Sequence, residues 1–76
     1  MNRMKVRIAV GQHAWFDFLA PEGFDFGRFC AEIRERGYWY NGENSYVPYA
    51  RIECVLYMPE AQLDGLESVH PMGKAN

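Results

Sequence analysis

The chain has 76 residues, of which 49% are hydrophobic and 16% aromatic, and its formal net charge is −2. This length allows one domain, and the large hydrophobic share argues against an intrinsically disordered chain. The weak negative charge provides no field that would attract nucleic acid, which disfavours direct DNA or RNA binding. We therefore expect residues 1–76 to form a single small domain.

Two cysteines, Cys30 and Cys54, are too few for a disulfide framework and form no CxxC pair. Each lies on an apolar face of its predicted element, so we expect both to behave as small buried hydrophobic residues. The run before Gly11 has too few apolar residues for a secretory signal, and no stretch reaches the length of a membrane span. The expected setting is reducing and cytoplasmic, without membrane association.

Two runs near the N-terminus alternate as β-strands do, residues 5–10 and residues 14–19. The connection between them is short and contains Gly11, which predicts a hairpin. In the first run Val6, Ile8 and Val10 share one side, so the strand reads as half-buried. If the phenylalanines of the second run lie on that side too, the opposite side brings cationic groups next to an aromatic ring and a carboxylate. The residues of that opposite side are Lys5, Arg7, Trp15 and Asp17.

The clearest helix signals lie in residues 24–37. Asp25 is placed to cap the first turn, with Phe24 and Phe29 at the two positions of a hydrophobic staple. Gly37 is suited to a left-handed C-cap. One face of the helix is apolar at helical spacing and must pack on another element. That face consists of Phe26, Phe29, Cys30 and Ile33.

A second hairpin is predicted after the helix. Residues 38–40 are strand-prone, residues 41–44 form a turn, and residues 45–49 return as a strand. Pro48 cannot donate to a ladder, so that strand lies at an edge or ends there.

The last strand is expected over residues 51–58, where strong alternation makes it the best candidate for the sheet centre. For residues 60–66 we expect one or two helical turns with Leu63 and Leu66 facing inward. We expect residues 67–76 to form a frayed tail. The predicted class is α+β: a small antiparallel sheet in the order β-β-α-β-β-β, with the amphipathic helix packed on one face.

Aromatic residues cluster around the turn at 41–44. Tyrosine and tryptophan combine rigid apolar area with a polar tip, and both are enriched at binding hot spots. Alternatively, alternate rings fill the core and the others form cross-strand pairs. Both interpretations stay open. The cluster comprises Tyr38, Trp39, Tyr40, Tyr46 and Tyr49.

Charge is segregated along the chain, because residues 52–70 contain four carboxylates and no lysine or arginine. Such an acidic end can dock on a basic site, including one that normally holds nucleic acid. A charge run is also the ordinary pattern of a solvated surface. The carboxylates are Glu53, Glu60, Asp64 and Glu67.

No constellation for catalysis or metal binding is present. His13 and His70 are isolated, and no group of histidine, cysteine and carboxylate side chains has metal-ligand spacing. A nucleophilic cysteine needs an accessible electropositive niche, whereas Cys30 and Cys54 fall on predicted core faces. We expect no enzymatic activity, no cofactor and no metal.

In type, the chain resembles the anti-CRISPR inhibitors and similar counter-defence proteins carried by phages and mobile elements. The resemblance covers the whole chain and consists of a compact acidic domain with surface-capable aromatics and carboxylates, without a shared motif. It implies a non-enzymatic inhibitor in the host cytoplasm that occludes a nucleic-acid-binding surface of a CRISPR surveillance complex. The expected partner-binding residues are Trp39, Tyr40, Tyr46, Tyr49, Glu60, Asp64 and Glu67.

Two alternatives remain. The chain could be a small bacterial ligand-binding or regulatory domain whose aromatic cluster lines a pocket between helix and sheet. It could also be a homodimer, joined through the edge strand near Pro48 or through the open sheet face.

Overall fold

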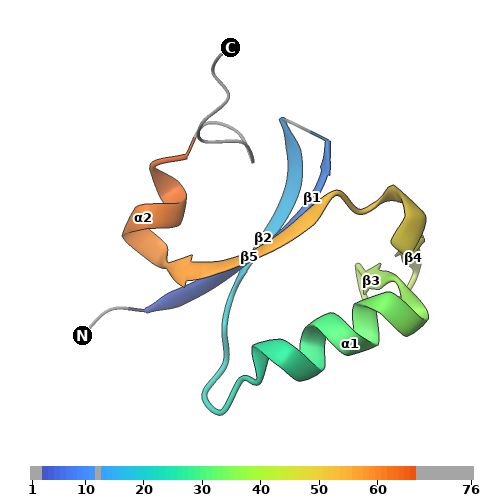
Figure 1. Ribbon diagram of the computed structural model, residues 1–76, viewed down its shortest axis with the longest axis horizontal. Helices are drawn as coiled ribbons and strands as arrows, with labels where there is room; N and C mark the ends of the chain where they lie inside the picture. The colour runs from blue at the N-terminus through green and yellow to red at the C-terminus, as the bar shows by residue number, and fades with distance from the viewer. Residues whose placement is uncertain (1–2, 12, 67–76) are drawn as a thin grey trace.

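The structure, a computed structural model, describes residues 3–11 and 13–66 and has the predicted α+β class and order of elements (Figure 1). Its elements are β1 (Met4–Gly11), β2 (Ala14–Leu19), α1 (Phe26–Arg36), β3 (Tyr38–Tyr40), β4 (Ser45–Val47), the 3₁₀ turn η1 (Tyr49–Arg51), β5 (Cys54–Pro59) and α2 (Glu60–Asp64).

The described strands divide into two antiparallel sheets, one with the order β2-β1-β5 and one formed by β3 and β4. The prediction that residues 51–58 form the sheet centre is wrong, because β1 pairs with a neighbour on each side and β5 lies at an edge. The prediction that only one side of β1 is buried is also wrong, since Val6, Arg7, Ile8 and Ala9 are all buried. A central strand covered on both faces buries consecutive residues rather than alternate ones.

One face of the three-stranded sheet carries the main core, against which α1 packs. Val6 and Ile8 of β1 and Ile33 of α1 are its buried residues. The register places Phe18 and Tyr57 beside Val6 on the neighbouring strands, so their rings extend the same face. Large rings bury much area per residue, which helps so short a chain to build a core.

The opposite face holds the predicted contacts around Arg7. Its guanidinium donates two hydrogen bonds to Asp17, at 2.8 and 2.9 Å, and lies 4.1 Å from the centre of the Trp15 ring. Both the opposite-charge pair and the cation–π contact are confirmed. The Arg7 side chain is only 3% exposed.

The short helix α2 covers part of this opposite face. Leu63 is fully buried, and Lys5, whose side chain points away from the Val6 and Ile8 face, forms an ion pair with Asp64. The inward position of Leu63 is confirmed and Leu66 is half-buried, while α2 itself ends at Asp64. The tail predicted for residues 67–76 lies outside the described residues.

The start of α1 follows the sequence signals. The Asp25 carboxylate accepts a hydrogen bond from the backbone N–H of Arg28 at 3.1 Å, as an N-cap does. The rings of Phe24 and Phe29 lie 5.4 Å apart, which confirms the staple.

The end of α1 brings the second hairpin against the helix. Gly37 donates to the carbonyl of Ile33 at 2.7 Å and has the positive φ expected of a C-cap, 76°. Its ψ of −166° is extended, so the chain enters β3 directly. A Cβ at Gly37 would lie 2.5 Å from the Val47 carbonyl oxygen and 2.6 Å from Cε1 of Tyr46. Only glycine permits this approach.

The boundaries of the later strands differ from the predicted ones. The strand expected over residues 45–49 ends at Val47, and the strand expected over residues 51–58 begins at Cys54. Pro48 lacks an N–H for a ladder, and Ile52 donates to the Tyr49 carbonyl, which closes the 3₁₀ turn between the strands. Neither described helix is long and apolar enough to cross a membrane.

Candidate functional site

The β3–β4 hairpin has an inner face that packs on the three-stranded sheet. Tyr38 and Tyr40 project to the same side of β3, and their rings lie 5.5 and 4.5 Å from the ring of Phe16 on β2. A two-stranded hairpin is marginal by itself, so these contacts fix its position. Tyr40, predicted to touch a partner, is therefore half-buried in intramolecular packing.

The outer face of the hairpin carries Trp39 and Tyr46. They are directly opposite in the register, and their ring centres are 4.7 Å apart. Despite this contact, Trp39 is 41% exposed and Tyr46 48% exposed. Tyr49 is also exposed, but it lies in η1 and lines a different groove, with Phe26 and Cys30. The structure thus pairs two of the predicted contact residues, and we call Trp39 and Tyr46 the aromatic pair.

The carboxylates predicted to contact a partner lie away from the aromatic pair. Glu60 accepts from Arg3 at 2.9 Å and Asp64 from Lys5 at 2.7 Å, so both are already neutralised by cations at the start of the chain. In Figure 1 α2, which carries them, and the β3–β4 hairpin lie at opposite sides of the molecule. Glu60 and Asp64 therefore form no common surface with the aromatic pair. Glu67 lies outside the described residues.

The Lys5 and Asp64 pair has a pH signature. The hydrogen bond to Asp64 raises the pKa of Lys5 above its ordinary value of 10.5. A raised pKa in the folded state means that the pair stabilises the fold at neutral pH and that this stabilisation is lost as the pH rises through that pKa. We expect Asp64→Asn to lower the thermal midpoint by a few degrees at most at pH 7, because exposed pairs contribute little.

Thermal unfolding of wild type and Asp64→Asn, at pH 7 and above pH 11, measures the contribution of the Lys5 and Asp64 pair. The difference between wild type and Asp64→Asn should shrink at the higher pH, where Lys5 is increasingly neutral. Glu35→Gln, at an exposed carboxylate of α1, is the matched control and should show no such change. A difference that stays constant across pH would contradict the pair's contribution.

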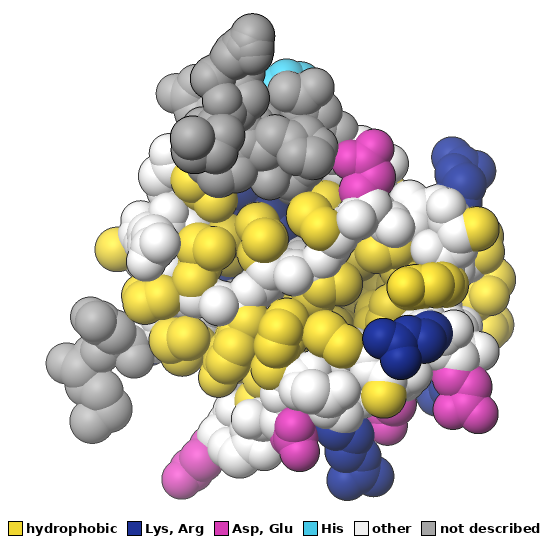
Figure 2. All heavy atoms as spheres, viewed as in Figure 1, with side chains coloured by type: hydrophobic (Ala, Val, Ile, Leu, Met, Phe, Trp, Pro, Cys, Tyr) yellow, Lys and Arg dark blue, Asp and Glu magenta, His cyan; other side chains and the backbone are white. Residues whose placement is uncertain are grey.

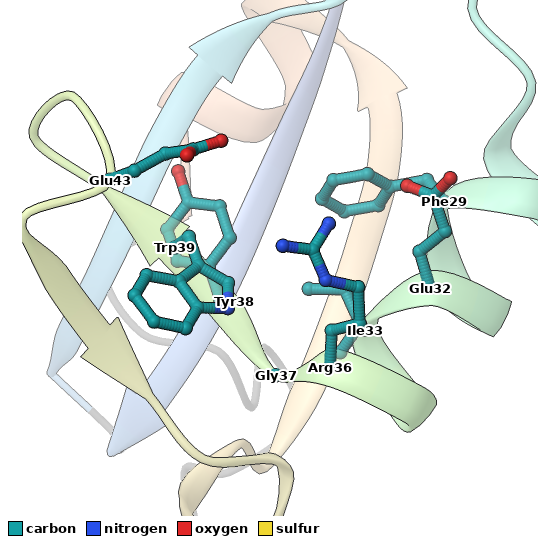
Figure 3. Close-up of a pocket in the computed structure, with 8 residues that line it drawn as sticks. All are labelled: Phe29, Glu32, Ile33, Arg36, Gly37, Tyr38, Trp39 and Glu43. Atoms are coloured by element: carbon teal, nitrogen blue, oxygen red, sulfur yellow. The ribbon is translucent and has the colours of Figure 1, made fainter.

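A groove of about 190 Å³ lies beside Trp39, between the last turns of α1 and β3 (Figure 3). Three charged side chains reach it: Glu32 and Arg36 from the helix, and Glu43 from the turn. In Figure 3 the Arg36 guanidinium projects between Trp39 and Glu32. The other lining residues are Phe29, Ile33, Gly37 and Tyr38.

The turn that presents Glu43 is left-handed at three successive residues: Asn41, Gly42 and Glu43 have φ of 57°, 67° and 67°. Asparagine and glycine tolerate this region, whereas glutamate there costs about 1 kcal/mol. Sequence reasoning identified this segment as a turn but did not propose Glu43 as a site residue. The sequence signal that could have identified Glu43 is a glutamate directly after Asn41-Gly42, at a turn position where glycine or asparagine is favoured.

A second groove, of about 250 Å³, lies between the two sheets. It is largely aromatic and apolar, with Arg51 as its one charged lining residue among those described. The lining residues are Val10, Phe16, Tyr40, Tyr46, Val47, Pro48 and Arg51.

The cysteines sit beside a third groove, and both are half-buried. Burial raises the pKa of the Cys30 thiol, partly offset by Arg34, and burial with the nearby Glu53 raises the pKa of the Cys54 thiol. Both thiols are thereby held protonated, the less reactive form. Within the described part of the chain, no group of three histidine, cysteine or carboxylate residues could hold a metal ion.

On the face seen in Figure 2, hydrophobic side chains form a broad band across the middle. Charged side chains gather mostly along the lower and right-hand margins, the side on which Figure 1 places α1 and the hairpin. Apolar area bordered by charge is typical of surfaces that contact other molecules.

Comparison with protein-family models, with curated proteins and with solved structures finds no match. The fold is therefore described by its class: a small α+β protein with a three-stranded antiparallel sheet, a second two-stranded sheet and one main helix.

Proposed function

We propose that this protein is a non-enzymatic protein-binding module that contacts its partner through the outer face of the β3–β4 hairpin. The observation that supports it is the exposure of the aromatic pair, 41% for Trp39 and 48% for Tyr46, on a hairpin whose inner face packs on Phe16 of β2. Rigid aromatic side chains lose little conformational entropy on binding and often contribute most of an interface's affinity.

The resemblance to anti-CRISPR inhibitors supplies the candidate partner, a CRISPR surveillance complex in the cytoplasm of the host cell. Inhibition would act by occlusion, with the hairpin covering part of a nucleic-acid-binding surface. A net charge of −2 suits a local plug better than broad imitation of DNA. In this proposal Glu60 and Asp64 hold α2 to Arg3 and Lys5 at the start of the chain and are not contact residues.

Binding to purified CRISPR surveillance complexes and to a bacterial lysate tests the proposal, with the chain immobilised. Replacing both Trp39 and Tyr46 by serine should weaken retention of the partner by about 30-fold or more, the effect of losing about 2 kcal/mol at a hot spot. Glu60→Gln serves as the control and should bind as wild type does. Equal retention by the serine variant, with its fold verified by circular dichroism, would contradict the proposal.

The second groove favours the ligand-binding alternative. An aromatic groove with one arginine among its described lining residues suits a small molecule that combines a ring with a carboxylate. Such a ligand would raise the thermal midpoint of wild type, since it binds only the native state. Arg51→Gln should abolish that rise.

A further inference from the structure

We infer that the groove beside Trp39 receives a guanidinium side chain of the partner protein, with Glu43 as its carboxylate acceptor and the Trp39 ring as its flat support. This inference rests on the proposed function and specifies the chemistry of the partner's contact residue, an arginine.

The charged side chains that line the groove favour a cationic group. The three basic residues of the first strand region, Arg3, Lys5 and Arg7, are all in ion pairs with carboxylates. The other described residues include six carboxylates and four arginines. Within the groove itself two carboxylates face one arginine, which leaves a net negative charge that complements a cation.

Glu43 is available for such a contact. Across residues 3–11 and 13–66 it forms no ion pair or hydrogen bond. Glu32, the other carboxylate of the groove, is 3.8 Å from Arg28 across one helical turn. A carboxylate binds a guanidinium through two parallel hydrogen bonds, and an exposed indole stacks on the guanidinium plane. Glu43 and Trp39 together supply both interactions.

The backbone conformation of Glu43 makes its role separable from folding. At a φ of 67° a glycine or asparagine would be more stable than glutamate. Glu43→Gly should therefore raise the thermal midpoint while removing the acceptor. Loss of binding in a more stable variant is not an outcome that a structural role for Glu43 would produce.

Replacing Arg36 should change the affinity for a cation in the opposite direction to replacing Glu43. Its guanidinium projects into the same groove in Figure 3 and would repel or compete with an incoming cation. Neutralising it doubles the net negative charge of the groove, so Arg36→Gln should strengthen binding of a cation. Glu43→Gln should weaken it.

The experiment is an NMR titration of the ¹⁵N-labelled full chain with N-acetyl-arginine N-methylamide, with the uncharged N-acetyl-citrulline N-methylamide as control. We expect saturable shifts at the Trp39 indole N–H and the Glu43 amide with the arginine probe only. Affinity should fall about tenfold in Glu43→Gln and Glu43→Gly and rise several-fold in Arg36→Gln. Equal shifts from both probes, no shift at these two groups, or no dependence on Glu43 and Arg36 would each overturn the inference.

Failure of this inference is distinguishable from failure of the proposed function. If retention of a partner depends on the aromatic pair but the arginine probe does not bind, the hairpin is a contact surface without a guanidinium site. If the probe binds as expected but partner retention is unchanged by replacing the aromatic pair, the proposed contact surface is wrong.

Discussion

Gly37→Ala should lower the free energy of unfolding by about 3 kcal/mol or more, a large part of the stability of so short a chain. Two effects add. An alanine at a φ of 76° and a ψ of −166° lies in a region that essentially only glycine occupies, at a cost on the order of 1–3 kcal/mol, and its Cβ would meet the Val47 carbonyl oxygen at 2.5 Å. That oxygen belongs to the backbone of β4, so relief requires the hairpin to move away from α1.

Urea unfolding of the two chains measures this difference, and Gly23→Ala separates the two effects. Gly23 also has a positive φ, 79°, but a Cβ there would meet no atom within 4 Å. We therefore expect Gly23→Ala to show only the conformational effect, about 1 kcal/mol. If both variants lose the same stability, the close approach between the helix end and the hairpin is not a constraint on the fold.

Asp17→Asn should be the other severe substitution, with a loss of about 3 kcal/mol. The Arg7 guanidinium is almost fully buried and donates two hydrogen bonds to Asp17, so the variant leaves a buried charge without its counter-ion. One of its nitrogens, Nη1, already has no hydrogen-bond partner in the described part of the chain, so little else can compensate. Urea unfolding at neutral pH measures the loss.

A double variant controls for the change in shape. Arg7→Met combined with Asp17→Leu removes both charges and should recover most of the stability, since apolar residues of similar volume often replace a buried pair without penalty. Stability that is unchanged in Asp17→Asn would show that the pair contributes nothing. A double variant as unstable as Asp17→Asn would show that packing around Arg7, rather than its charge, is what matters.

The features predicted correctly from the sequence depend on neighbours along the chain. The Asp25 cap, the staple of Phe24 and Phe29 and the register of the first hairpin each involve residues within one turn or one hairpin. The contacts of Arg7 with Trp15 and Asp17 follow from that register.

The arrangement of the sheets could not be predicted because it depends on distant segments. Strand β1 is central only because β5, about 50 residues later, pairs with its second edge. The alternation of residues 5–10 places Arg7 on a solvent side, and the predicted hairpin contacts with Asp17 and Trp15 do not by themselves indicate that its side chain is buried. The second sheet is separate because, among the described strands, β3 and β4 pair with each other and with no strand of the first sheet, and no local pattern indicates this.

The candidate site was only partly predicted from the sequence, again because some of its features depend on contacts between distant segments. The aromatic pair is formed by residues on either side of one turn, which the sequence indicates directly. The ion pairs that occupy Glu60 and Asp64 join residues 57 and 59 positions apart, so from sequence these carboxylates look available for a partner. Glu43 gains its position from the left-handed turn and from the end of α1, which only the fold brings together.

Amide hydrogen exchange of the chain, free and bound to the partner that it captures, tests most directly whether the hairpin is the contact surface. The account predicts that exchange slows on binding in residues 38–47 and in the last turn of α1, while residues 60–64 are unchanged. Slowed exchange in residues 60–64 with an unchanged hairpin would contradict it and return the contact surface to the carboxylates of α2.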